Sequence, residues 1–191
     1  GGNLTGFFVR SSELAAKRVE LAHEALPNVK RMALWWDSTT RAQGEAAEAA
    51  AKALGLEAQL VGVSGQPPDY ENAFRLGGRL RVDAIILASS PAYLVARADI
   101  VRLAMARRLP VIAAFREFVD DGALLSYGVD LPSLFRDIAG YVDGIARGAK
   151  PADLPVAQPA KFDLVINLKT ARTLGIAIPP ALRARADAVI E

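Results

Sequence analysis

The regular alternation of short apolar runs with helical patterns is the feature that most constrains the fold of this 191-residue chain. Strands are predicted at residues 31–36, 56–63, 83–88 and 111–115, and each is a nearly continuous apolar run. Such runs are typical of strands whose two faces are both covered by helices. A helix is predicted between each pair of strands, with short connections, which favours a parallel, doubly wound α/β sheet with right-handed crossovers.

Local signals set the expected ends of the helices, at about residues 11–26, 40–54, 69–80 and 91–108. Asp69 is placed to cap the third helix, and Pro91 suits the first turn of the fourth. A strand is also expected at residues 4–9. The pattern changes after Gly128: Asp130 caps a helix to about residue 147, and a proline-rich connection follows over residues 150–159. A strand at 162–166, a helix after Asn167 and a last helix from residue 179 to 191 complete the prediction.

The amino-acid composition excludes several classes of function but does not identify one. The content of hydrophobic residues, 52%, is enough for one ordinary domain or slightly more. The 23 basic and 21 acidic residues are interspersed, which argues against a nucleic-acid partner. The absence of cysteine removes disulfides and thiol chemistry, and no apolar run approaches the ~20 residues that span a bilayer.

Polar side chains follow three of the predicted strands, where ligands bind in open α/β sheets. Asp37, Ser38 and Thr39 follow the first, Ser89 and Ser90 the third, and Arg116 and Glu117 the fourth. Hydroxyls next to helix N-termini suit an anion, a carboxylate suits an ammonium group, and an arginine suits a carboxylate. Tyr93 and Tyr127 could supply apolar walls. The alternative is that the hydroxyl residues only cap helices.

This set of residues predicts a binding site for a small polar or zwitterionic ligand. His23 is the only histidine and lies within a predicted helix, so neither a Ser-His-Asp triad nor a multi-histidine metal site is expected. No nucleophile–base pair and no nucleotide-binding motif stands out. The prediction is therefore a protein without enzymatic activity, catalytic residues, metal or cofactor.

Five segments have the character of family motifs. They are Gly-Gly-Asn-Leu-Thr-Gly at residues 1–6, the helical segment 17–27, Phe-Arg-Glu-Phe at 115–118, Gly-Ala-Leu-Leu-Ser-Tyr-Gly at 122–128, and the tail 161–182. Together they resemble the substrate-binding proteins of ABC transporters related to the tryptophan/tyrosine-binding type. The resemblance covers the whole chain, with residues 1–6 matching that family's hinge sequence.

The resemblance implies a two-lobed, periplasmic-binding-protein-like fold with the ligand held between α/β lobes. Residues 11–128 would form a complete lobe two. Residues 1–10 and 129–191 would supply the hinge and the C-terminal part of lobe one, most of which would be missing from an N-terminally truncated chain. By position, the lobe-two ligand contacts would come from Asp37, Ser38, Thr39, Ser89, Ser90, Arg116 and Glu117. The family often has Asn-Pro where this chain has Asp37-Ser38, so the ligand could differ.

The resemblance also implies partners and a location. An amino-acid-like ligand, aromatic ones included, would be delivered to an ABC permease outside the cytoplasm, in the periplasm, although no signal peptide is recognisable at residues 1–6. The alternative function is the ligand-sensing effector domain of a transcription regulator with the same fold. Strands 4–9 and 162–166 would lack partners from the missing segment, and such edges pair with other chains, so a homodimer is expected.

Overall fold

The computed structural model describes residues 2–65 and 68–191, which form two compact units. The sheet unit contains Ser11–Gly128 and Asp163–Glu191. The helical unit contains the N-terminal segment up to Arg10 and Val129–Phe162. Residues 66 and 67 lie outside the described residues.

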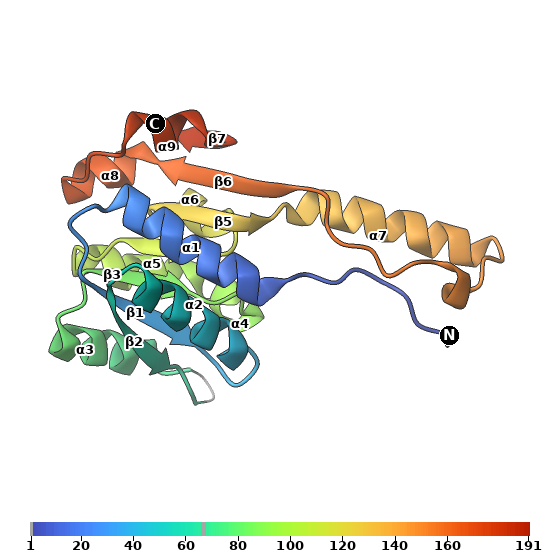
Figure 1. The fold of residues 1–191 in the computed structure, drawn as a ribbon, viewed down its shortest axis with the longest axis horizontal. Helices are drawn as coiled ribbons and strands as arrows, with labels where there is room; N and C mark the ends of the chain where they lie inside the picture. The colour runs from blue at the N-terminus through green and yellow to red at the C-terminus, as the bar shows by residue number, and fades with distance from the viewer. Residues whose placement is uncertain (1, 66–67) are drawn as a thin grey trace. The chain divides into compact units, whose positions relative to one another are not determined.

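Among the described residues, seven strands form one sheet in the order β2-β1-β3-β4-β5-β6-β7 (Figure 1). The strands are β1 (Arg31–Trp36), β2 (Glu57–Gly62), β3 (Ala84–Leu87), β4 (Val111–Ala113), β5 (Leu125–Val129), β6 (Phe162–Asn167) and β7 (Ala188–Ile190). The pairs β1–β2, β1–β3, β3–β4, β4–β5 and β6–β7 are parallel. The predicted parallel α/β sheet is therefore confirmed, with its core strands close to the expected positions.

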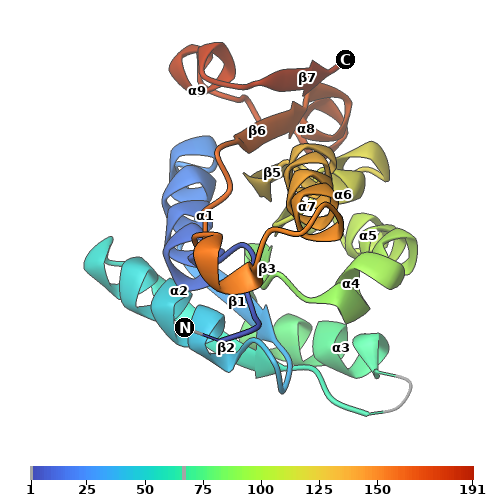
Figure 2. The same cartoon turned by 90° about the vertical axis from the view of Figure 1, so that its right-hand side faces the viewer.

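Successive residues of each central strand pack on opposite faces of the sheet, because side chains alternate along a strand. Met32 and Leu34 pack with α1 (Ser11–Ala25) and α2 (Arg41–Ala53) on one face. Ala33 and Trp35 pack with α3 (Tyr70–Leu80), α4 (Pro91–Val95) and α5 (Arg97–Ala106) on the other. Figure 2 shows α1 and α2 on one side of the sheet and α3, α4 and α5 on the other. The sheet is doubly wound, as predicted.

Asp69, a predicted cap, and Asn167 both cap the helices that follow them. The Asp69 carboxylate accepts from the backbone N–H of Asn72 at 2.9 Å, and Asn167 Oδ1 accepts from the N–H of Thr170 at 2.8 Å. The latter begins α8 (Leu168–Leu174). These contacts satisfy N–H groups that have no partner within their own helix.

Three predicted elements differ from the structure. The helix expected over 91–108 is divided at Ala96 into α4 and α5. Glu117, which follows the fourth predicted strand and where no helix is predicted, begins the short helix α6 (Glu117–Asp120). The last helix, α9 (Pro180–Ala184), is short, and β7 follows it because Ala188, Val189 and Ile190 pair with β6.

The C-terminal segment 163–191 packs in the sheet unit, which corrects the expectation that residues 129–191 group together. Strand β6 lies between β5 and β7, and Val165 and Ile166 are fully buried. Ile166 shares a core cluster with Ile112 and Leu125. Residues 162–166 were expected to lack strand partners; this is wrong, because the buried apolar residues complete the sheet.

The helical unit is built around α7 (Leu131–Ala146), which the Asp130 carboxylate caps by accepting from Ser133 N–H at 3.1 Å. The strand expected over residues 4–9 is reduced to one parallel bridge between Phe7 and Ala157. Pro159 has no N–H with which to extend that ladder. In residues 2–65 and 68–191, no helix has the length and apolar character required to cross a membrane.

Candidate functional site

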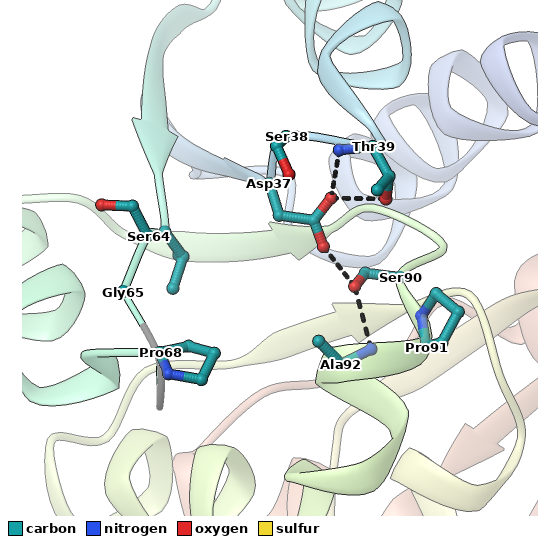
Figure 3. A pocket seen from close by; sticks show the side chains of 10 residues that line it. Asp37, Ser38, Thr39, Ser64, Gly65, Pro68, Ser90, Pro91 and Ala92 are labelled. Carbon is teal, nitrogen blue, oxygen red and sulfur yellow. Dashed lines mark hydrogen bonds between the residues drawn. The ribbon is translucent and has the colours of Figure 1, made fainter.

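A pocket of about 860 Å³ opens at the carboxyl ends of β1, β2 and β3 in the sheet unit (Figure 3). Three segments line it: the turn after β1, the loop after β2 and the start of α4 after β3. The lining residues are Asp37, Ser38, Thr39, Val63, Ser64, Gly65, Pro68, Ser90, Pro91 and Ala92. This is the edge of the sheet at which α/β proteins bind ligands.

Asp37 is the centre of the hydrogen bonds in this pocket. Its Oδ1 accepts from Thr39 N–H at 2.9 Å, Thr39 Oγ1 at 2.7 Å and Thr40 Oγ1 at 3.0 Å. Its Oδ2 accepts from Ser90 Oγ, which in turn accepts from Ala92 N–H at 3.1 Å. The carboxylate therefore joins the end of β1 to the end of β3. Since a carboxylate offers about four lone-pair sites, Oδ2 retains capacity for one more donor.

The environment keeps Asp37 ionised. Partial burial by itself raises the pKa of Asp37, but hydrogen bonds from Ser90, Thr39 and Thr40 outweigh it, so the pKa lies below the usual value of 3.8. These bonds favour the charged form because they donate to it. At neutral pH the pocket therefore carries a negative charge.

An aromatic cluster lies close to Asp37 in the sheet unit. The Trp35 ring is stacked 6.5 Å from that of Tyr70 and is edge-on to Tyr93 at 6.4 Å. Burial first, and then the charge of Asp37, raise the pKa of both tyrosines, so both hydroxyls stay neutral. The Tyr70 hydroxyl donates to Ala92 O at 3.2 Å.

The structure brings four of the predicted site residues together: Asp37, Ser38, Thr39 and Ser90 all line the pocket. Ser89 lies next to it, with its N–H donating to Gln43 Oε1 at 2.8 Å. Tyr93 is only 1% exposed and packs in the core, so it does not form an open wall.

The other three predicted residues lie outside the described lining of this pocket. Arg116 is exposed, with its Nε 3.9 Å from Asp120 Oδ2 on the next turn. Glu117 begins α6. Tyr127 is half-buried on β5, and its carbonyl accepts from Arg18. The structure therefore does not assemble them with Asp37 inside the sheet unit's pocket.

Sequence reasoning missed the loop after β2 as a wall of the pocket. Val63, Ser64, Gly65 and Pro68 belong to it. A signal was present, because Ser64, Gly65 and Pro68 directly follow a predicted strand, as Asp37 follows β1. Gly65 has a φ of 106°, a backbone conformation that favours glycine.

The pocket's chemistry is that of a site for a cation or a hydroxyl-rich group. Among its described lining residues there is one carboxylate, four hydroxyls and no Lys, Arg or His. Across the described ranges, no three His, Asp or Glu side chains are grouped as metal ligands. An ammonium group is the charged partner that this pocket would accept.

Comparisons with known proteins agree with this fold. An ABC domain from Streptococcus pneumonia in complex with L-Trp is similar at 28% identity and a TM-score of 0.89, over 100% of this chain and 64% of that one. A conserved domain protein from Vibrio cholerae is similar at 29% identity and a TM-score of 0.87, over 99% and 64% of the two chains. The chain therefore spans somewhat less than two thirds of those proteins.

A LacI family transcriptional regulator from Arthrobacter shares the fold alone, at 16% identity and a TM-score of 0.63, over 86% of this chain and 65% of that one. None of the curated proteins compared with the chain matches it. The profile of the family described as "ABC transporter substrate binding protein" matches residues 1–190. Because this match covers nearly the whole chain, the protein belongs to the ABC transporter substrate-binding protein family.

Proposed function

We propose that this protein is the solute-binding component of an ABC importer. It captures a small zwitterionic, amino-acid-like ligand between two lobes and delivers it to a membrane permease outside the cytoplasm. The observation that carries this proposal is the ionised Asp37 in a hydroxyl-lined pocket at the ligand-binding edge of the sheet. Family membership supplies the transport role.

In this proposal the sheet unit is lobe two, now including residues 163–191, and the helical unit contributes to the hinge and lobe one. The longer relatives support the presence of a larger lobe one in the whole protein. A homodimer is not part of the proposal. It was expected because two strands would lack partners, but one of them, β6, lies between β5 and β7 in the sheet.

The proposed ligand carries an ammonium group that binds Asp37 Oδ2, with the hydroxyls of Ser38 and Thr39 beside it. The similar ABC domain in complex with L-Trp supports an amino acid with an aromatic side chain. Arg116, Glu117 and Tyr127 are proposed as further contacts along the same edge of the sheet, with Arg116 binding the ligand's carboxylate.

Isothermal titration calorimetry with three related compounds tests this assignment. L-Tryptophan has both charges, tryptamine lacks the carboxylate, and indole-3-propionate lacks the ammonium group. We expect the first two to bind and indole-3-propionate to bind at least about tenfold more weakly, the cost of one hydrogen bond to a charged group. Asp37→Asn should weaken tryptophan and tryptamine by a similar factor.

The matched control is Asp99→Asn, which removes an exposed carboxylate on α5 that pairs with Arg102. It should leave all three affinities unchanged. Equal affinity for indole-3-propionate and tryptophan would show that Asp37 does not bind an ammonium group of the ligand. Failure of every amino acid in a wider thermal-shift panel would contradict the ligand class. The regulator alternative has only the shared fold in its favour.

A further inference from the structure

Arg18 is a buried cation that the ligand pocket does not explain. It lies on α1 and is 0% exposed. Burial lowers its pKa to about 10, so the guanidinium is still protonated at neutral pH. Its hydrogen-bond partners are two neutral oxygens, and among the described residues its Nε has no partner. Burying a charge without an opposite charge beside it lowers the stability of the fold, because the charge loses its hydration. The contacts of Arg18 indicate a role other than packing.

The guanidinium connects three elements of the sheet unit. Nη1 donates to the Tyr127 carbonyl at the end of β5 at 3.2 Å. Nη2 donates to Gln43 Oε1 in the first turn of α2 at 3.5 Å. Gln43 Oε1 also accepts from the N–H of Ser89, after β3, at 2.8 Å. A single amide oxygen therefore holds both Arg18 and the turn that contains Ser89.

That turn sets the position of the pocket's central hydrogen bond. Ser90, the next residue, donates to Asp37 and accepts from Ala92 N–H. Gln43 lies on α2, the helix that follows the Asp37–Thr40 turn. Gln43 thus contacts the end of β3 through its side chain and the turn after β1 through its backbone N–H, which donates to the Thr40 carbonyl at 3.0 Å.

The backbone at Tyr127, which accepts from Arg18, is packed closely against the end of the neighbouring strand. A Cβ added to Gly128, next to Tyr127, would lie 2.0 Å from the Ala114 carbonyl oxygen, so the backbones there approach very closely. The Tyr127 carbonyl is therefore a rigid anchor for Arg18 inside the sheet unit. A lysine could not replace the guanidinium, since its single ammonium cannot reach two diverging acceptors as a planar fork does.

From this geometry we infer that Arg18 is a positioning residue for the ligand pocket: through Gln43 it holds the Ser89–Ser90 turn so that Ser90 and Asp37 face the ligand. The inference rests on the proposed function for its binding consequence. The arrangement of the turn itself does not depend on which ligand binds.

Amide hydrogen exchange, read by mass spectrometry on peptides covering residues 84–96 of the full chain, tests the arrangement without any ligand. Arg18→Met and Gln43→Met should each speed exchange of the Ser89 amide by about tenfold. Gln43→Met removes the oxygen that accepts from the Ser89 N–H, and Arg18→Met removes the hydrogen bond that holds that oxygen in place. Arg18→Lys should resemble Arg18→Met. Gln43→Glu keeps the acceptor and adds a carboxylate beside Arg18, so it should keep exchange slow and raise the melting temperature.

Val19→Ala is the matched control for a general loss of stability, because Val19 is the next residue on α1 and is also 0% exposed. It should lower the melting temperature without a selective increase of exchange at residues 84–96. If Val19→Ala gives the same exchange pattern as Arg18→Met, the positioning role is wrong and Arg18 is structural only. Slow exchange in Gln43→Met would also overturn the inference.

L-Tryptophan titrated by calorimetry gives the second readout. Arg18→Met should weaken the binding of tryptophan by about tenfold, whereas Gln43→Glu should bind tryptophan with the affinity of the unmodified chain. Unchanged affinity in Arg18→Met would overturn the binding consequence. If the unmodified chain does not bind tryptophan, the proposed function fails, whereas the exchange experiment still decides the positioning role.

Discussion

At the scale of single residues, the two oxygens of the Asp37 carboxylate have different surroundings. Its Oδ1 is saturated by donors from Thr39 and Thr40, whereas Oδ2 is shared between Ser90 and the open pocket. Of the hydroxyl residues that the sequence offers as helix caps, Ser90 caps α4 by accepting from Ala92 N–H, whereas the side chain of Thr40, the N-cap residue of α2, makes no capping hydrogen bond.

The lowered pKa of Asp37 predicts a pH dependence of stability. Its folded pKa lies below 3.8, so its contribution is present above the unfolded pKa and is lost as the pH falls through the folded pKa. The difference in melting temperature between the unmodified chain and Asp37→Asn should be largest near pH 7 and should narrow below about pH 4, near the pKa of an unperturbed aspartate. Melts by circular dichroism across this range check it; a difference that widens toward low pH would contradict it.

Gly128 is predicted to tolerate no side chain. Gly128→Ala would place a Cβ 2.0 Å from the backbone oxygen of Ala114, which cannot rotate away. We expect a loss of about 1–3 kcal/mol or more in the free energy of unfolding, as for overpacked cores. Urea denaturation measures it. Gly78→Ala is the control: the site is helical and open, so a gain of about 0.5–1 kcal/mol is expected.

At the scale of elements, β6 and α8 are joined to the rest of the sheet unit by the side chain of Asn167. Its Oδ1 caps α8, and its Nδ2 donates to the carbonyl of Val119 in α6 at 3.0 Å. One side chain therefore satisfies two backbone groups in different elements, both of them buried.

Asn167→Ala should destabilise the chain more than removal of a simple cap. It loses the cap and leaves the Val119 carbonyl without its donor, so we expect about 2–4 kcal/mol. Asp69→Ala removes an exposed side chain that caps α3, and it should cost about 1 kcal/mol. Urea denaturation of both variants measures the two costs. Equal costs would show that the contact with Val119 contributes nothing.

At the scale of the whole molecule, residues 163–191 are predicted to be required for the sheet unit to fold. Residues 11–128 alone would leave one edge of β5 unpaired, whereas the same residues joined to 163–191 keep both of its edges paired, with β4 and β6. A short Gly/Ser linker can replace residues 129–162, because the Asp130 N–H donates to the Lys161 carbonyl at 3.2 Å and the two ends therefore lie close together.

The joined protein should unfold in one cooperative thermal transition and elute as a compact species. Residues 11–128 alone should melt at a clearly lower temperature or aggregate, since an exposed apolar strand edge pairs with other chains. Circular dichroism and size-exclusion chromatography distinguish them. A stable, monomeric 11–128 would mean that β6 and β7 add nothing essential to this fold.

The sequence by itself determined the alternation of strands and helices and which residues follow each strand. Apolar runs, caps and prolines are local signals, so β1, β3, α1 and the cap at Asp69 could be predicted from them. The placement of Asp37, Ser38, Thr39 and Ser90 at one edge followed, because parallel strands end on the same side.

Only the tertiary structure decided which strand ends meet. Strand order places β1 between β2 and β3, so the loop after β2 joins the pocket while Arg116, after β4, stays outside its described lining. It also decided that β6 completes the sheet and that Arg18 reaches Gln43 and Tyr127. These contacts join residues 25 to 109 positions apart, and no local signal encodes such pairings because they depend on how the helices and strands pack.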